Sequence, residues 1–360
     1  MKTKRRVARK VRPYQRVVES LRQVVAQALE RGDSFLGTEV SVAEANKVSR
    51  MTARKGVNAL IAEGLVERRA GIGLFVRNQT ASGFVYRALF GNLFWDPSIK
   101  VASAIRRESQ KVGSKVEFFD AGGEEARFLS EIAALPKSDV KGAIIFSQHG
   151  KAFDAAIDKL AESGFPFVVV DETVAGEDVS SFVSDNEEGG RLAAQALIDA
   201  GHRNVAFIGD MAADTVMARW TGFLEACEKA GVKPQKHDIR STSRLGDWGA
   251  DVRAIAEKVL HQKVRPTALF CSCDAVARLV MRTFSDHGVR VPDDISLVGF
   301  DDDPIAEWMS PALTTVRQDF DTMGVKAFGS LIARVGDPSS APRRETIPVR
   351  LIVRESIKSL

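Results

Sequence analysis

The segment VSRMTARKGVNALIAEGLVERRAGIGLFV, residues 48–76, decides the fold of the N-terminal part of the chain. After a tight turn, apolar residues recur at helical spacing at Ala53, Val57, Leu60 and Ile61. Gly64 follows, at a position where helix C-termini favour glycine. Two strand candidates, 65–69 and 74–77, are joined by residues 70–73, whose glycines permit a tight connection. The segment therefore predicts a helix followed by a small β-hairpin.

Two further helices are predicted before this segment. Residues 14–30 carry one apolar stripe at helical spacing, made of Val17, Val18, Leu21, Val24, Val25, Ala28 and Leu29. Ser41 with Glu44 three residues later has the capping-box pattern, which predicts a second helix that begins at Ser41. The order helix, helix, turn, helix, hairpin is that of a winged helix-turn-helix.

The polar face of the third helix is rich in hydrogen-bond donors. It carries Arg50, Thr52, Arg54, Lys55 and Asn58. Such side chains suit phosphates and base edges in a DNA major groove. A three-helix module that binds another protein is the alternative at this point.

Charge is distributed unevenly along the chain. The formal net charge is +4, yet residues 1–78 hold 17 Lys/Arg against 7 Asp/Glu, and the remainder holds 34 against 40. A basic segment on a mildly acidic body is typical of a module that binds a polyanion. Because eight of the basic residues lie in the first sixteen positions, a solvated tail explains the charge equally well.

From residue 84 onward, strand and helix patterns alternate. Strand candidates are 142–146, 167–171, 205–209, 268–272 and 296–299, and helix candidates are 151–163, 187–200, 219–230 and 274–287. Short apolar strands that alternate with helices indicate parallel sheets covered on both faces. We expect the lobes to divide near Ser184 and again near Thr315, with three crossings of the chain between them.

Acidic residues follow several of these strands. Asp171 ends VVVD, Asp210 ends FIGD, Asp274 follows FCSC and Asp301 follows LVGF. Ligands of parallel sheets bind beyond the carboxyl ends of the strands. Aspartate is also favoured at helix N-caps, and for Asp274, Asp210 and Asn186 that interpretation stays open.

Residues 48–76 resemble the GntR family of winged-helix repressors along nearly their whole length. The resemblance implies DNA contacts by Ser49, Arg50, Thr52 and Arg54 from the recognition helix and by Gly71 from the wing. The family usually has an arginine early in its second helix, where this chain reads Glu39–Val40–Ser41. Operator affinity or sequence preference is therefore expected to differ from the family norm.

Residues 140–356 resemble the sensor domain of the LacI family and, more distantly, periplasmic sugar-binding proteins. The most specific stretches are SDNEEGGRLAAQALIDAGHRNVAFIGD, VPDDISLVGFDD and SPALTTVRQDF. The resemblance implies that Arg219 donates to ligand oxygens, that Asp301 accepts from ligand hydroxyls and that Trp248 stacks on the ligand. A carboxylate, a guanidinium and an aromatic ring suit a polyol. The alternatives are a structural Arg219–Asp301 pair and a core position for Trp248.

Further ligand contacts are predicted with less specific support. They are Asp171, Thr215 and Gln318, together with Phe94 and Trp95 in the loop NLFWDP, which could close the other lobe over a ligand. Many relatives read Ala-Asn-Asp where this chain has Ser272–Cys273–Asp274, so an amide donor is replaced and the ligand of relatives does not carry over.

Other classes of protein are disfavoured. Cys271 and Cys273 lack the ligand spacing of a zinc site, and no phosphate-binding loop, nucleophile elbow or dinucleotide glycine pattern is present, so no metal and no cofactor is expected. The enzyme alternative is a pyridoxal phosphate domain fused to a winged helix. A secreted solute-binding protein is the second alternative, but the basic N-terminus is not followed by an apolar signal segment.

The sequence thus predicts an α/β protein with a winged helix-turn-helix at 1–78, a linker at 79–83 and a two-lobed, periplasmic-binding-protein-like domain at 84–360. The predicted function is that of a cytoplasmic transcription regulator, a repressor rather than an enzyme. Its predicted partners are double-stranded operator DNA, a small-molecule effector of carbohydrate type and a second copy of the chain, with no membrane.

Overall fold

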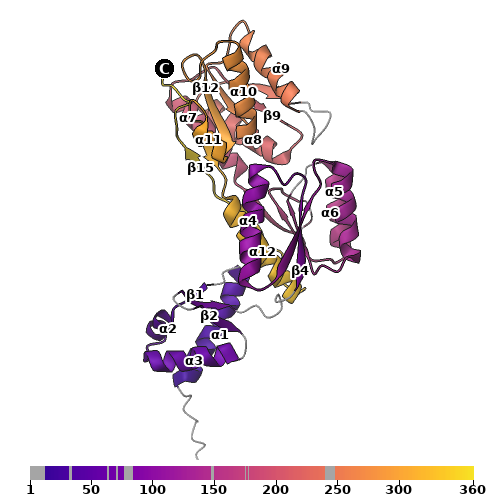
Figure 1. Ribbon diagram of the computed structural model, residues 1–360. Helices are drawn as coiled ribbons and strands as arrows, with labels where there is room; N and C mark the ends of the chain where they lie inside the picture. The colour runs from indigo at the N-terminus through magenta and orange to yellow at the C-terminus, as the bar shows by residue number, and fades with distance from the viewer. Residues whose placement is uncertain are drawn as a thin grey trace, which may run out of the picture.

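The computed structural model describes residues 13–31, 35–62, 65–69, 72–76, 84–146, 150–174, 176, 178–239 and 248–360. Three bodies follow one another along the molecule (Figure 1): a small N-terminal unit at one end, a first six-stranded sheet in the middle and a second six-stranded sheet at the other end.

The N-terminal unit consists of three helices and a three-stranded sheet. Its elements are α1 (Pro13–Arg31), β1 (Phe35–Gly37), α2 (Glu39–Ala45), α3 (Arg50–Ala62), β2 (Val66–Arg69) and β3 (Gly73–Val76). The strands pair antiparallel in the order β1-β3-β2. Apolar residues of α1 and α3, among them Val17, Leu21, Val57 and Leu60, form its core. This arrangement confirms the predicted winged helix-turn-helix.

Two local predictions in this unit were wrong. Helix α2 begins at Glu39, and its capping box joins Thr38 and Ser41: the Ser41 N–H donates to Thr38 Oγ1 at 3.2 Å, and the Thr38 N–H donates to Ser41 Oγ at 2.9 Å. Both residues are good capping types, and Thr38 was overlooked because its partner three residues later is Ser41 rather than the glutamate or glutamine of the usual pattern. Val24 was assigned to the buried stripe of α1 but is 38% exposed.

The first six-stranded sheet is entirely parallel. Its order is β14 (Arg344–Ile347), β8 (Ser180–Ser184), β7 (Phe167–Val170), β6 (Ala143–Phe146), β4 (Val85–Phe90) and β5 (Lys115–Asp120). Helices α4 (Asp96–Lys111) and α12 (Phe320–Gly336) bury apolar side chains against one face. Helices α5 (Glu125–Ala134) and α6 (Lys151–Glu162) cover the other, and a short 3₁₀ turn, Leu135–Lys137, follows α5. We call this body the first lobe.

The second six-stranded sheet is parallel except at one edge. Its order is β10 (Gln235–Asp238), β9 (Val205–Gly209), β11 (Ala268–Cys271), β12 (Ser296–Asp301), β13 (Thr314–Arg317) and β15 (Arg350–Ile352), with β15 antiparallel to β13. Helices α7 (Asn186–Asp199) and α8 (Asp214–Lys229) cover one face. Helices α9 (Trp248–Leu260) and α10 (Asp274–Asp286) cover the other, and α11 (Pro304–Trp308) lies after β12. We call this body the second lobe.

The chain passes between the two lobes three times. It crosses from β8 to α7, returns from β13 to α12 and crosses again from β14 to β15. The predicted crossings near Ser184 and Thr315 are confirmed. These three connecting segments form a hinge, which permits the lobes to move while each lobe keeps its own core.

The two helices on one face of the second lobe touch backbone to backbone. A Cβ on Gly190 of α7 would lie 2.8 Å from the Phe223 nitrogen, and one on Gly222 of α8 would lie 2.7 Å from the Glu187 carbonyl carbon. Glycine is required at both places because any side chain atom would collide with the partner backbone. This close contact fixes the position of α8, and with it the side chain of Arg219.

Among the described residues, no helix has both the length and the apolar character needed to cross a membrane.

Candidate functional site

A cavity of about 460 Å³ lies between the two lobes, beyond the carboxyl ends of β7 and β12. Parallel strands end at the same edge of their sheet, so the loops that follow them meet at this place. Seven of the residues predicted to bind a ligand line it: Phe94, Trp95, Asp171, Thr215, Arg219, Asp301 and Gln318. The eighth, Trp248, opens α9, but its side chain lies outside the described residues.

Arg219 projects from α8 into the cavity wall and is held on several sides. Its Nε donates to Asn186 Oδ1 at 2.8 Å, and its Nη1 donates to the carbonyl oxygen of Ser272 at 2.6 Å. The guanidinium carbon lies 3.8 Å from the centre of the Phe300 ring, and Nη1 lies 3.8 Å from Asp301 Oδ1. Asn186 therefore acts as a support for Arg219, a role that the N-cap interpretation missed; the N-cap of α7 is Asp185.

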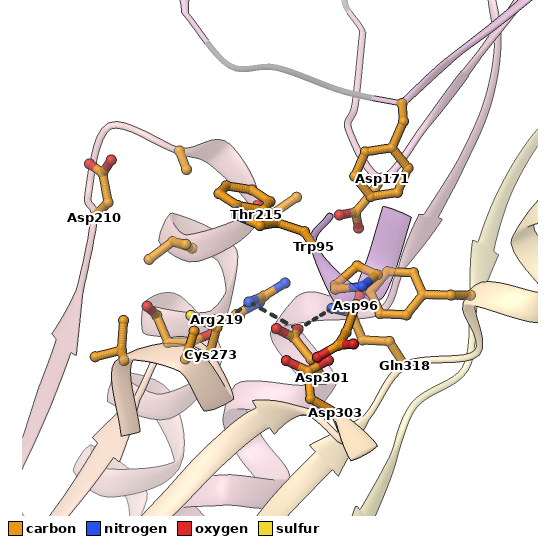
Figure 2. A pocket seen from close by; sticks show the side chains of 18 of the residues that line it. Trp95, Asp96, Asp171, Asp210, Thr215, Arg219, Cys273, Asp301, Asp303 and Gln318 are labelled. Atoms are coloured by element: carbon orange, nitrogen blue, oxygen red, sulfur yellow. Dashed lines mark hydrogen bonds and ion pairs between the residues drawn. The ribbon is translucent and has the colours of Figure 1, made fainter. Parts of the chain in front are cut away.

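Asp301 and Gln318 form a second buried pair beside this arginine (Figure 2). Gln318 Nε2 donates to Asp301 Oδ1 at 2.6 Å. The two residues are only 7% and 4% exposed. No described residue donates to Gln318 Oε1, although this atom is buried. A buried acceptor without a donor costs about 1–3 kcal/mol, so this pair leaves an acceptor ready for a ligand hydroxyl or amine.

The backbone at both strand ends is strained. Asp171, Asp301 and Asp302 have φ angles of +66°, +109° and +51°. Residues other than glycine rarely adopt these conformations, and they persist where neighbouring contacts hold them. Asp302 provides such contacts, because its carboxylate is paired with Arg317 and Arg354. The strain turns Asp301 toward the cavity while Asp302 anchors the loop.

Asp274 and Asp210, whose roles the sequence left open, differ from each other. Asp274 is fully buried, accepts from the Thr315 hydroxyl at 2.6 Å and from the Asp303 N–H at 2.8 Å, and does not line the cavity. It therefore ties α10 to the loop after β12 and to β13. Asp210 lines the cavity and accepts from the Ala212 N–H at 3.0 Å in the turn before α8. Neither residue is a helix N-cap.

Burial raises the pKa of four carboxyl groups around the cavity. The pKa values rise to about 6 for Asp171, 8 for Glu172, 6 for Asp301 and 7 for Asp303, mainly because burial penalises the charged form. Repulsion from Asp171 adds to the rise at Glu172, and repulsion from Asp301 adds to the rise at Asp303. The Arg219 guanidinium opposes the rise at Asp171 and Asp301.

Glu172 and Asp303 were missed by the sequence analysis. Each lies one or two residues after a strand-end aspartate that was predicted, so the strand ends VVVDE and LVGFDDD contained the signal. What could not be foreseen is their burial: Glu172 is 3% and Asp303 is 7% exposed.

The mouth of the cavity carries exposed aromatic side chains from the first lobe. Phe94 is 84% and Trp95 is 46% exposed, in the loop that precedes α4. In the same helix, Lys100 reaches the second lobe, where its Nζ donates to the Asp302 carbonyl oxygen at 2.9 Å and lies 3.7 Å from Asp303 Oδ1. The two lobes are thus in contact on one side of the cavity.

The N-terminal unit presents a second candidate site on α3. Arg50, Arg54, Lys55 and Asn58 are exposed, as predicted for a surface that meets DNA. Ser49 lies just before the helix, where its hydroxyl accepts from the Thr52 N–H at 3.2 Å. The predicted wing residue Gly71 lies outside the described residues.

Arg68 of β2 is a feature of this surface that the sequence analysis missed. It forms an ion pair with Glu39 of α2, and its Nη2 donates to Asn58 Oδ1 at 2.8 Å. The related family usually has an arginine early in this helix, where the chain reads Glu39–Val40–Ser41, and Arg68 from the hairpin neutralises the charge of Glu39 there. The carbonyl end of Asn58 is engaged by this bond.

Comparison with known proteins agrees with this two-part architecture. Residues 178–357 match the family of the periplasmic binding protein-like domain, and residues 13–76 match the bacterial regulatory proteins of the gntR family. The chain belongs to the periplasmic binding protein-like family and carries a GntR-type helix-turn-helix domain at its N-terminus.

Its curated relatives include HTH-type transcriptional repressors. The chain is 37% identical over 196 residues to the repressor PurR of Shigella dysenteriae serotype 1 (strain Sd197). The aligned residues cover 53% of this chain and 56% of that protein. It is 36% identical over 197 residues to PurR of Escherichia coli O1:K1 / APEC, again over 53% and 56%. The chain thus spans little more than half the length of the curated relatives it matches.

Solved structures share the fold at low sequence identity. A LacI family transcriptional regulator from Enterococcus faecium with bound ribose has a TM-score of 0.67 and 22% identity, over 77% of this chain and 99% of that one. The complex of the transcriptional regulator CelR with cellobiose has a TM-score of 0.68 and 22% identity, over 94% and 99%. These likenesses establish the fold.

Proposed function

We propose that this chain is a sequence-specific DNA-binding transcription regulator, a repressor, whose operator binding is controlled by a sugar or sugar derivative in the cavity between its lobes. The observation that carries this proposal is the presence in one chain of an exposed cationic helix face and a separate buried cavity with an unsatisfied acceptor. Relatives that are regulators rather than enzymes support it.

The DNA side of the proposal depends on α3. Its exposed face projects Arg50 and Arg54 away from a core that α3 shares with α1. Removing these side chains therefore leaves the packing of the unit intact. A bidentate contact from an arginine to guanine contributes about 1–3 kcal/mol of discrimination between base pairs.

The effector side depends on the buried polar set. Asp301 and Gln318 offer acceptors for vicinal hydroxyl groups, Arg219 supplies a guanidinium, and the exposed ring of Trp95 can cover an apolar sugar face. Cavities of this size hold small molecules of up to a few sugar rings. Cofactor and metal sites are not part of the proposal, and within the described ranges no cluster of three His, Cys, Asp or Glu side chains is placed to hold a metal ion.

Coupling between the two sites runs through the first lobe. Helix α1 of the N-terminal unit contacts α12, which begins directly after the crossing from β13. Gln318 lies in that crossing, so a ligand that binds it acts on the segment leading into α12. An effector shifts the operator equilibrium only by its different affinity for the two arrangements of the lobes.

The remaining parts of the proposal concern assembly and location. We propose a cytoplasmic homodimer, since a two-fold dimer matches a palindromic operator. The boundaries 1–78, 79–83 and 84–360 are proposed for the DNA-binding domain, the linker and the sensor.

The test is selection of DNA from a random duplex library by the full chain, followed by titration of the selected duplex. The double variant Arg50→Ala, Arg54→Ala should lose specific binding, while the charge-matched control Arg253→Ala, Arg282→Ala, which removes two exposed arginines of the second lobe, should retain it. Failure to select any sequence, or wild-type affinity in the first variant, would falsify the DNA-binding proposal.

A further inference from the structure

The cavity has a marked excess of acidic side chains. Six carboxyl groups line it, from Asp96, Asp171, Glu172, Asp210, Asp301 and Asp303, against two guanidinium groups, from Arg219 and Arg278. Arg219 is already engaged by Asn186, Ser272 and Asp301, and Arg278 is exposed. The described wall therefore has little positive charge left for an anionic ligand such as a sugar phosphate.

In the cavity wall, one buried oxygen of Gln318 and one of Asp303 have no hydrogen-bond partner among the described residues, and both oxygens are acceptors. Gln318 donates its amide group to Asp301, and its buried Oε1 has no donor among the described residues. Asp303 Oδ1 is also buried without a hydrogen bond, and the nearest cation, Lys100 Nζ, lies 3.7 Å away while it donates to a backbone carbonyl. A ligand that satisfies these two atoms must bring donors rather than acceptors.

The carboxyl groups come from both lobes and repel each other across the cavity. Asp171 and Glu172 follow β7 in the first lobe, whereas Asp301 and Asp303 follow β12 in the second. Figure 2 shows Asp171 with its carboxylate directed toward the side where Arg219 and Asp301 lie. The charge of Asp171 in the first lobe raises the pKa of Asp301 in the second lobe, because the two carboxylates repel each other.

Glu172 is affected first by its burial and then by acidic side chains of both lobes. Besides Asp171, the acidic side chains of Asp214 on α8 and Asp154 on α6 act on it, and each raises its pKa. Proton uptake by the carboxylates relieves the repulsion. A cation placed between the lobes relieves it equally well, and it also attracts both lobes toward itself.

We propose that the effector is a polyhydroxylated molecule that carries a protonated amine, an amino sugar, with its ammonium group between the carboxylates of the two lobes and its hydroxyl groups on Asp301 and Gln318. This inference rests on the proposed function and specifies the ligand class of the same cavity. The ammonium is what distinguishes the cavity from one built for a neutral sugar, because Arg219 and Lys100 leave several carboxylates uncompensated.

Proton release is a measurable consequence. The pKa of Glu172 is about 8, so this group is mostly protonated at pH 7 in the empty protein. A neighbouring ammonium favours the ionised form, so binding of an amino sugar at pH 7 should release protons from the cavity. A neutral sugar has no charge with which to expel it.

The experiment is isothermal titration calorimetry on the full chain without DNA. The probes are D-glucosamine, D-galactosamine and D-mannosamine, each compared with its parent hexose and with its N-acetyl derivative, which keeps the ring but removes the charge. Titrations in phosphate and in MOPS, whose ionisation enthalpies differ and neither of which is a polyhydroxylated amine, report the protons released. At least one amino sugar should bind about tenfold or more tightly than both of its neutral partners, with proton release.

Two variants sharpen the result. Glu172→Gln keeps the shape of the side chain but removes its charge, and it should abolish most of the preference for the amine together with the proton release. Glu162→Gln removes an exposed charge from α6 in the same lobe, outside the cavity, and should keep both.

The outcomes separate this inference from the proposed function. A hexose that binds as tightly as its amino partner overturns the ammonium assignment and leaves a sugar-controlled regulator standing. Binding by none of the amino sugars overturns the inference as well, and the DNA selection then decides the DNA-binding proposal independently.

Discussion

Gly222 offers the sharpest test of how packing controls the cavity. It lies in the middle of α8, where a Cβ would stand 2.7 Å from the Glu187 carbonyl carbon and 3.0 Å from its Cα, both in α7. The Glu187 carbonyl oxygen would lie closer still. Carbon atoms in contact prefer about 3.5–4.0 Å, so Gly222→Ala requires the two helices to separate by at least about 1 Å. The obstructing atoms are backbone, so no side chain rotation relieves the collision.

Two effects of opposite sign compete in this variant. Alanine is a better helix former than glycine by about 1 kcal/mol, which favours the variant. Overpacking a rigid contact costs about 1–3 kcal/mol, occasionally more, and a backbone-to-backbone collision belongs at the upper end of that range. We therefore expect the free energy of unfolding to fall by about 2 kcal/mol.

The same shift should reach the cavity. Arg219 lies one helical turn before Gly222, and its bonds to Asn186 and Ser272 measure 2.8 and 2.6 Å. A displacement of about 1 Å breaks bonds of this length, because donor and acceptor must lie within about 3.2 Å. The affinity for the sugar selected by calorimetry should fall about tenfold or more.

Urea denaturation and calorimetry measure the two consequences. Gly190→Ala, which meets the same contact from α7, should behave alike, and Lys229→Ala, an exposed change on α8, should behave like the unsubstituted chain. If Gly222→Ala is as stable as the unsubstituted chain and binds the sugar normally, helix propensity outweighs packing and the α7–α8 contact does not position Arg219.

Three further predictions concern the effector response, the basic N-terminus and pH. Asp301→Asn should still bind the selected operator but respond to the sugar only at concentrations one to two decades higher, because a charged acceptor of ligand protons is lost; an unchanged response in an operator titration places the effector elsewhere. Deleting residues 2–12 should flatten the salt dependence of DNA binding with less effect on sequence discrimination, and an unaltered slope of log affinity against log salt would show that this segment does not contact phosphates. Thermal stability should fall as pH rises from 5 to 8, because Glu172, with a pKa raised from 4.5 to about 8, holds a proton in the folded protein that the unfolded chain has released. Its contribution is complete below pH 4.5 and is lost as pH rises through about 8, so Glu172→Gln should flatten the melting-temperature profile measured by calorimetry across this range.

Much of this protein was determined by local patterns in its sequence. Helical periodicity predicted α1 and α3 because their buried stripes repeat within a few residues, although the exposed Val24 was assigned to the core. The apolar strands at 143–146, 167–170, 205–209 and 268–271 were recognisable because central parallel strands are buried on both faces. The edge strands β5, β10, β14 and β15 were not identified, since their alternating or polar residues resemble those of loops.

The residues of the cavity also fall into two groups: those that the sequence predicted and those whose role only the tertiary structure decided. Asp171 and Asp301 stood out because they end buried strands, and the resemblance to sensor domains supplied Arg219 and the ligand role of Asp301. Gln318 was predicted with less specific support. The roles of Asn186 and Asp274 were decided by tertiary structure, since their hydrogen-bond partners lie 33, 29 and 41 positions away in the chain. Glu172 and Asp303 looked like ordinary solvated acids in the sequence. The tertiary structure buries them and brings like charges close to them, and no local sequence pattern encodes either effect.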